Sequence, residues 1–349
     1  MSVELVRRAW VALGDGREAE NYWDASPGVS SNRVYRVQLS DGNSVFAKVI
    51  SYGSFIHFRQ DHQRIAQWRD LLSESPFGHF LAPILSKEGE PFVYRSNRDW
   101  LVFCEEVEPG ESLPRRLSTG QVRSLGHALA EFHKESQVAA ESLDSTWKTM
   151  GSDVAALFDR VTDPEWRSAR NFTRNQAAMI ERHCESFFRN AERIGYHSMQ
   201  RIPVLVDWNI TNFSTETASG KKGGDDFRFF RRWDYDWFRI EPRTLDFYFM
   251  SRVVREEGDT SRFSYTADML LEPRFRLFLE AYHERNPLEP ADILFLKEAY
   301  RFFVLNYVLH LGEHFFQWSL CKRLQHEAVE TYLPSIDEMD LGPLLEILR

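Results

Sequence analysis

The sequence predicts an α+β fold with two lobes, a small N-terminal lobe built on an antiparallel sheet and a larger, mainly helical C-terminal lobe. Strand patterns dominate the chain before residue 108. A Pro109–Gly110 pair follows, and such pairs commonly mark a connection. Beyond it, apolar residues recur mostly at helical spacing. We therefore expect lobes at residues 1–107 and 108–349.

The small lobe begins with residues 3–13, whose apolar positions follow helical spacing and predict a short helix. Tyr35, Val37 and Leu39 alternate with polar neighbours, and an Asp41–Gly42 turn signal separates them from the apolar run 45–50. This pattern predicts a β-hairpin.

Lys48 lies on the second strand of that hairpin, and Asp61 lies on a helix predicted at about residues 55–72. A strand lysine often covers apolar surface with its stem and keeps its ammonium in solvent, and this interpretation stays open. Alternatively, an acid on the inner face of the helix can hold the ammonium toward phosphates. We expect a Lys48–Asp61 ion pair in the nucleotide-competent state.

The loop before the hairpin is small and polar, and it contains Gly28, Ser30, Ser31 and Asn32. Such a loop can present backbone N–H groups to phosphates, although it is not a Walker A sequence. By itself it is also typical of an ordinary loop. Residues 100–107 predict a further strand that leads into the Pro–Gly connection.

The larger lobe contains the residues best suited to chemistry. An apolar run, residues 202–206, ends in Asp207, and Asn212 follows one short loop later. Asp234 and Asp236 lie in a second aromatic-rich run, RRWDYDWF. These groups can converge on a divalent metal and a hydroxyl, as phosphoryl transfer from a nucleotide requires. Asp and Asn in loops also serve as turn residues that cap local backbone.

Helical patterns surround these runs. A serine or threonine cap at 118–119 begins one helix, and the chain from residue 247 onward is expected to be mainly helical. The polar segment 215–226 is typical of the solvated tip of a hairpin.

Composition excludes several classes of protein. A net charge of -9 argues against a nucleic-acid binder, which usually presents a basic face. The three cysteines are far apart and form no CxxC pattern, so a disulfide framework or zinc site is not expected. Charges interrupt the N-terminal MSVELVRRAW, and the apolar stretch 302–311 is too short to cross a bilayer. We expect a cytoplasmic protein with no membrane partner.

Taken in order, these motifs resemble the aminoglycoside phosphotransferase and choline kinase superfamily, which has a protein-kinase-like fold. GVSSNRVYRV resembles the nucleotide-covering loop, VFAKV the phosphate-positioning lysine strand, and LVFCEEVEPGESL the hinge strand. LGHALAEFHK resembles the family's LA-x-x-H helix, and VLVDWNITNF the catalytic loop. WDYDW followed by RTLDF, with Asp246, resembles the metal-binding strand and its downstream aspartate. The resemblance covers nearly the whole chain, and it rests on the shared order and spacing of the motifs.

The resemblance implies a role for each residue of the catalytic loop and the metal-binding strand. Asp207 would be the catalytic base, Asn212 and Asp234 would bind Mg²⁺, and Asp236 would be a further metal-site carboxylate. Lys48 would contact the α- and β-phosphates of ATP.

The nucleotide would also meet the loop of Ser30, Ser31 and Asn32, and the hinge backbone from Glu105 to Val107 would bind adenine. Asp61 stands where the family has a helix glutamate. Two further departures lie in the catalytic loop, where Leu205 replaces the family histidine and Val206 a glycine.

The implied activity is transfer of the ATP γ-phosphate to a hydroxyl of a small molecule, such as an amino alcohol, a hydroxy amino acid, a sugar or an aminoglycoside-like compound. The alternative is a catalytically silent kinase-like protein that binds nucleotide or a partner. A silent protein has no chemical need to keep Lys48, Asp207, Asn212 and Asp234 together, which favours the enzyme.

A cationic acceptor could be received by acidic residues or by tryptophan faces through cation–π contact. The acids considered are Glu256, Glu257 and Glu313, and the tryptophans are Trp233, Trp237 and Trp318. Solvated faces and core packing are the ordinary uses of such residues.

Overall fold

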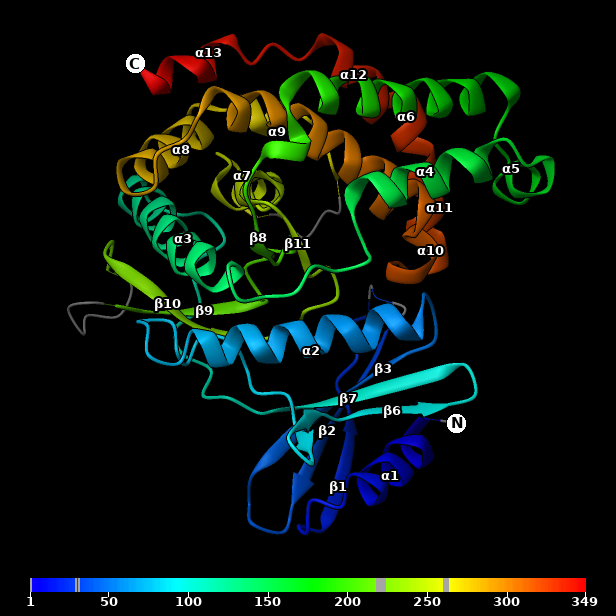
Figure 1. Cartoon of the computed structure of the whole chain (residues 1–349), viewed down its shortest axis with the longest axis vertical. Coiled ribbons are helices and arrows are strands. Elements are labelled where there is room, and N and C mark those ends of the chain that lie inside the picture. Colours follow the sequence, from blue (N-terminus) through cyan, green and yellow to red (C-terminus); the bar gives the residue numbers. More distant parts are fainter. Residues whose placement is uncertain (1, 29, 31, 218–223, 260–263) are drawn as a thin grey trace.

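The computed structural model describes residues 2–28, 30, 32–217, 224–259 and 264–349. It confirms the α+β prediction, with an antiparallel sheet next to a larger body of helices (Figure 1). The sheet has the strand order β1-β2-β3-β7-β6. Its strands are β1 (Ala19–Asp24), β2 (Arg33–Leu39), β3 (Ser44–Ile50), β6 (Val93–Ser96) and β7 (Asp99–Glu105). A short pair, β4 (Ser86–Lys87) and β5 (Glu90–Pro91), stands apart from it. We call the sheet together with helix α1 the sheet lobe.

Helix α1 (Ser2–Leu13) covers the outer face of this sheet, at the lower end of the molecule in Figure 1. Its Trp10 meets the ring of Phe103 edge-on at 5.1 Å between centroids. Because side chains alternate along a strand, Val45, Ala47 and Val49 join that outer core while Lys48 faces the opposite side.

Helix α2 (Phe55–Leu71) lies between the sheet and the helical body (Figure 1). The side chain of Ser54 caps its N-terminus by accepting a hydrogen bond from the N–H of His57. Phe58 packs with Trp100 of the sheet, whereas Ile65 and Trp68 belong to the core of the helical body. One helix therefore buries its apolar side chains in both parts of the molecule.

The elements from α3 onward form what we call the helical lobe. Its longer helices are α3 (Thr119–Ala140), α4 (Met150–Val161), α5 (Pro164–Arg170), α6 (Arg174–Ile194), α7 (Phe247–Val254), α8 (Pro273–Arg285), α9 (Pro290–Phe303) and α11 (Trp318–Glu327). Shorter ones are α10 (Gly312–Phe315), α12 (Leu333–Glu338) and α13 (Gly342–Leu345). Segments Val304–His310 and Ala328–Tyr332 are π-helical. Single 3₁₀ turns occupy Tyr196–Ser198, Arg243–Leu245, Asp268–Leu271 and Glu346–Leu348.

Helix α3 begins with the predicted cap, since Ser118 and Gln121 form a capping box. It packs closely on α8 at Gly126, where an added Cβ would lie 2.5 Å from the carbonyl oxygen of Phe278. A glycine is required there because no side chain fits between the two backbones.

Two small antiparallel ladders position the loops that carry the chemistry. Strand β8 (Arg201–Val204) pairs with β11 (Arg239–Pro242), and β9 (Phe213–Thr217) pairs with β10 (Phe227–Arg232). Val204 faces Arg239 and Phe213 faces Arg232 in these ladders. The connection β8–β9, with Asp207 and Asn212, and the connection β10–β11, with Asp234 and Asp236, are therefore held side by side. Residues 218–223 of the predicted hairpin tip lie outside the described residues.

Strands β1 and β6 were not predicted. The sequence of β1, AENYWD, leaves four of its six residues exposed, so it lacks the apolar alternation that identifies a half-buried strand. In the described ranges, no helix combines the length and the apolar character needed to cross a membrane.

Candidate active site

Asp207 lies three residues after the buried end of β8, just beyond a bend with unusual backbone geometry. Val206 has φ = +62°, the left-handed region that β-branched residues rarely occupy. Its N–H donates to Oδ1 of Asp246 at 2.6 Å. This hydrogen bond stabilises the strained bend. The family that the sequence resembles has a glycine at the position of Val206.

Asp246 is fully buried, and its second oxygen accepts from Nε2 of His133 at 3.0 Å. Nδ1 of His133 lies 2.9 Å from the hydroxyl of Tyr282. Burial lowers the pKa of His133, so the ring is neutral and donates from Nε2. Leu205 fills apolar core volume, and the polar support of the loop comes from Asp246 and His133. The LA-x-x-H and RTLDF motifs thus meet directly beneath the loop.

The carboxylate of Asp207 accepts hydrogen bonds from the backbone and side chain of Asn209. Burial, and then the charge of Asp234, raise the pKa of Asp207 to about 6, although Arg232 opposes the shift. A carboxyl with this pKa can exchange a proton near neutral pH.

Sequence reasoning missed Arg232, a fully buried arginine at the end of β10. Its Nη2 donates to the carbonyl oxygens of Asp207 at 2.7 Å and Asp234 at 3.1 Å, which ties the two loops together. The guanidinium also lies over the ring of Trp208, 5.2 Å from its centroid. The arginine just before the WDYDW motif was the available signal.

Lys48 spans the two lobes. Its Nζ lies 2.7 Å from Oδ1 of Asp234 and 2.6 Å from Oδ1 of Asp236. Burial disfavours the ammonium, but the two carboxylates more than offset it, and the pKa of Lys48 is raised. Burial raises the pKa of Asp236 to about 6. At Asp234 burial is opposed by Lys48, by a hydrogen bond from the N–H of Asp236 and by Arg232, which together lower its pKa. The side-chain amide of Asn32 donates to Asp236 at 2.5 Å, so the polar loop also reaches this cluster.

The predicted Lys48–Asp61 ion pair does not form in this structure. Asp61 pairs instead with Lys148, in the connection before α4. The physical reason is the packing of α2: Ile65 and Trp68 insert into the helical lobe and turn Asp61 toward that lobe's connecting chain. Gln60 makes a similar contact by accepting from the N–H of Trp147.

One cavity of about 380 Å³ between the two lobes brings most of the predicted residues together. Its lining includes Ser30, Asn32, Lys48, Asp207, Asn212, Asp234 and Asp236. The amide nitrogen of Asn212 points to the carbonyl of Asp207 at 3.4 Å, which leaves its amide oxygen available. An amide oxygen and carboxylate oxygens on one wall are the hard donors that suit Mg²⁺. Ser31 lies outside the described residues.

The hinge residues Glu105 and Val107 are not part of this cavity. They line a separate hollow of about 350 Å³ together with Leu81 and Pro83. The backbone N–H of Val107 has no hydrogen-bond partner among the residues that the structure describes, so it can bind a ligand acceptor. The N–H of Glu105 is already bonded to the carbonyl of Pro83.

The acids considered for a cationic acceptor are not in the site cavity. Each forms an ion pair: Glu256 with Arg116, Glu257 with Arg255, and Glu313 with Arg170.

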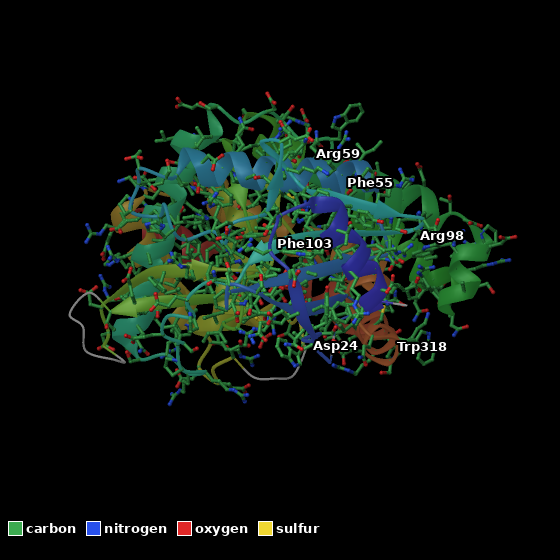
Figure 2. All side chains as sticks on the ribbon, turned by 90° about the horizontal axis from the view of Figure 1, so that it is seen from below. Asp24, Phe55, Arg59, Arg98, Phe103 and Trp318 are labelled. Atoms are coloured by element: carbon green, nitrogen blue, oxygen red, sulfur yellow. The ribbon has the colours of Figure 1, made fainter. Side chains whose placement is uncertain are left out.

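The three tryptophans also differ in position. Trp237 lines the site cavity but stacks on Tyr307 at 4.4 Å, within the aromatic core. Trp233 donates its indole N–H to the carbonyl of Thr211. Trp318 is 76% exposed and lies at the edge of the molecule in Figure 2, beside a different hollow.

No protein-family model matches the chain, and no curated protein matches it. Several solved structures are similar to it. A microcompartment-associated aminopropanol kinase is 17% identical with a TM-score of 0.61, covering 97% of this chain and 100% of that one. An amicoumacin kinase in complex with AMP-PNP, Ca²⁺ and Ami is 12% identical with a TM-score of 0.61, covering 99% of this chain and 97% of that one. A spectinomycin phosphotransferase in complex with ADP and spectinomycin is 13% identical with a TM-score of 0.52, covering 98% and 97%.

Proposed function

We propose that this chain, which has the fold of the aminoglycoside phosphotransferases and related small-molecule kinases, transfers the γ-phosphate of ATP to a hydroxyl of a small molecule. One observation carries the proposal. Lys48 of the sheet lobe lines a single cavity together with Asp207, Asn212 and Asp234 of the helical lobe. These are a cation for phosphates, a base for a hydroxyl and two oxygen donors for a metal ion.

Asp207 orients the acceptor hydroxyl and takes its proton as the oxygen bonds to the γ-phosphorus and the bond to the β-phosphate oxygen breaks. ADP is the leaving group. The transition state of phosphoryl transfer is loose, so positioning contributes more than full deprotonation before attack. The raised pKa of Asp207 suits a group that holds a proton during the reaction and releases it near pH 6 or above.

Lys48 would bind phosphate oxygens of the nucleotide, and Asn212 and Asp234 would hold Mg²⁺, with Asp236 as a further carboxylate. Mg²⁺ would neutralise charge that develops between the phosphates. Ser30 and Asn32 would cover the phosphates from the polar loop, and the N–H of Val107 would meet the adenine. Similar solved structures contain AMP-PNP with Ca²⁺ in one case and ADP in another, which supports a nucleotide and a divalent metal here.

A catalytically silent nucleotide binder is the second candidate. The replacement of the family histidine and glycine by Leu205 and Val206 favours it, because both lie in the catalytic loop. The structure weakens this argument, since Asp246 and His133 supply the hydrogen bonds that hold the loop.

The test has two stages. Calorimetry with ATP, with and without Mg²⁺, measures nucleotide binding, and ADP release against a panel of hydroxyl compounds measures transfer. We expect Asp207→Asn to keep ATP binding and lower turnover by about two to four orders of magnitude. Asp70→Asn, an exposed aspartate on α2, is the matched control. ATP binding without phosphorylation of any acceptor would favour the silent protein, and wild-type turnover by Asp207→Asn would exclude the proposed base.

A further inference from the structure

Arg252 of α7 lines the site cavity but has no part in the proposed phosphate and metal chemistry. Its side chain is buried, with the residue 5% exposed, and it shares the cavity with Asp207. The guanidinium lies over the rings of Phe249 and Tyr265, at 5.1 and 5.0 Å from their centroids. Such stacking fixes the plane of the guanidinium and thereby the direction of its donors.

The donors of Arg252 are largely unused. Its only hydrogen bond to a described residue is a long one, 3.4 Å from Nη1 to Oδ1 of Asn209, and it forms no ion pair with a described carboxylate. Two other buried arginines of the helical lobe are paired with carboxylates, Arg239 with Asp153 and Arg301 with Glu298, whereas Arg232 bonds the carbonyl oxygens of Asp207 and Asp234. Attraction to the carboxylates of Asp207 and Asp259 offsets part of the cost of burying Arg252 without an ion pair to a described residue, and an anionic ligand in the cavity would offset more.

Arg252 lines the cavity, so a ligand there can reach the donors that the long bond to Asn209 leaves unused. A planar guanidinium with accessible donors is the protein group best matched to a carboxylate, which it can bind with two parallel hydrogen bonds.

The part of the cavity around Arg252 differs from the metal side. It contains a second arginine, the exposed Arg115, whose carbonyl accepts from the N–H of Asp259 at 2.6 Å. Burial raises the pKa of Asp259, although the positive charges of Arg252 and Arg115 oppose the shift. The remaining wall is aromatic, from Trp237, Tyr265 and two phenylalanines, Phe315 and Phe316. This lining suits a small organic anion better than a ligand with several positive charges.

We propose that Arg252 binds a carboxylate of the acceptor, so that the acceptor is a small hydroxy acid. The inference rests on the proposed phosphotransferase function and names its substrate class. Asn209 sets the size of the acceptor, because its side chain donates to the carboxylate of Asp207 at one end and accepts from Arg252 at the other. The hydroxyl at Asp207 and the carboxylate at Arg252 are thus separated by the span of one amide side chain, a few bonds. A hydroxy amino acid or a short hydroxy acid fits that span.

The experiment compares acceptors that differ only in charge: homoserine with homoserine amide, serine with serine amide, and glycerate with glyceramide. ADP release gives kcat and KM for each. We expect the acids to be preferred, and Arg252→Met to raise the KM of the acids by about a hundredfold while leaving the KM of the amides unchanged. Arg252→Lys keeps the charge and should restore part of the preference. Arg276→Met, which removes an exposed arginine of α8, is the control.

Binding supplies a readout that does not depend on turnover. Acids without the hydroxyl, such as butyrate and alanine, should raise the melting temperature of wild type with ATP and Mg²⁺ but not that of Arg252→Met. If no acceptor is phosphorylated while this difference persists, the phosphotransferase function fails and the carboxylate site stands. If amides, amines or sugars have the same kcat/KM as the acids, the carboxylate inference fails and the phosphotransferase function stands. An equal loss of kcat for acids and amides would also overturn it, because Arg252 would then act on the transferred phosphoryl group.

Discussion

The ammonium of Lys48 in strand β3 lies 2.6 Å from the carboxylate of Asp236 in the β10–β11 connection, so one ion pair joins the sheet lobe to the helical lobe. Asp234 shares the same ammonium, and Asn32 donates to the other oxygen of Asp236. The lysine proposed to bind phosphate and the carboxylates proposed to bind metal are therefore in direct contact across the cavity.

Lys48→Met should lower both nucleotide affinity and stability. Its removal leaves two partly buried carboxylates without their cation, and we expect a loss of about 2 kcal/mol in the free energy of unfolding at pH 7, less than for a fully buried pair. The pKa of Asp234 is lowered in the folded protein, so its stabilising contribution is present at neutral pH and disappears as pH falls through that lowered pKa. Urea unfolding at pH 7 and pH 3 measures this.

The control for that variant is Lys134→Met, which removes an exposed lysine of α3. If Lys48→Met binds ATP with the affinity of wild type, Lys48 does not bind the nucleotide.

Asp61→Asn tests the corrected pairing. Because Asp61 bonds Lys148 and not Lys48, we expect ATP affinity to stay at the wild-type value while stability falls by about 1–3 kcal/mol. A double-mutant cycle with Lys148→Met should show coupling between the two residues in unfolding free energy. Zero coupling would contradict the Asp61–Lys148 pair. A rise in the KM for ATP like that of Lys48→Met would show that Asp61 contributes to nucleotide binding.

The sequence predicted the features that depend on local pattern. Helices α1 and α2 and the β2–β3 hairpin followed from periodicity, and the spacing of Asp207, Asn212 and Asp234 indicated a common site. The contacts of Lys48 and Arg252 could not be predicted in this way. They depend on how α2 and α7 pack, and each involves side chains from separate elements that only the folded core brings together.

Asp207→Asn should change the pH dependence of stability. In wild type, burial raises the pKa of Asp207 from 3.8 to about 6. Below pH 3.8 the carboxyl is neutral in both the folded and the unfolded protein, so it does not affect stability. As pH rises from 3.8 to about 6, the unfolded chain loses this proton before the folded protein does, and the free energy of unfolding of wild type falls. The uncharged asparagine has no such decline. The variant should therefore gain about 1–2 kcal/mol on wild type between pH 4 and pH 8, a figure reduced for the partial exposure of the site.

Urea unfolding of both proteins at several pH values checks this prediction, with Asp70→Asn as the control at an exposed site. A difference between variant and wild type that stays constant across this pH range would show that Asp207 does not titrate there.

Val206 offers the sharpest test of stored backbone strain. At φ = +62°, the left-handed conformation costs an L-residue with a Cβ about 1–2 kcal/mol that glycine avoids. At ordinary positions alanine is the more stable of the two, because glycine loses more backbone freedom on folding. We therefore expect Val206→Gly to be more stable than Val206→Ala by about 1 kcal/mol. Both lose the packing of a buried valine, so the comparison isolates the backbone.

Val204 in β8 is the matched control, since it is equally buried and lies in a regular strand. There the alanine variant should be more stable than the glycine variant. The same order at both positions would mean that Val206 is not strained. If glycine is more stable than alanine only at position 206, the backbone before Asp207 is strained. The hydrogen bond from the N–H of Val206 to Asp246 would then stabilise the loop against that strain.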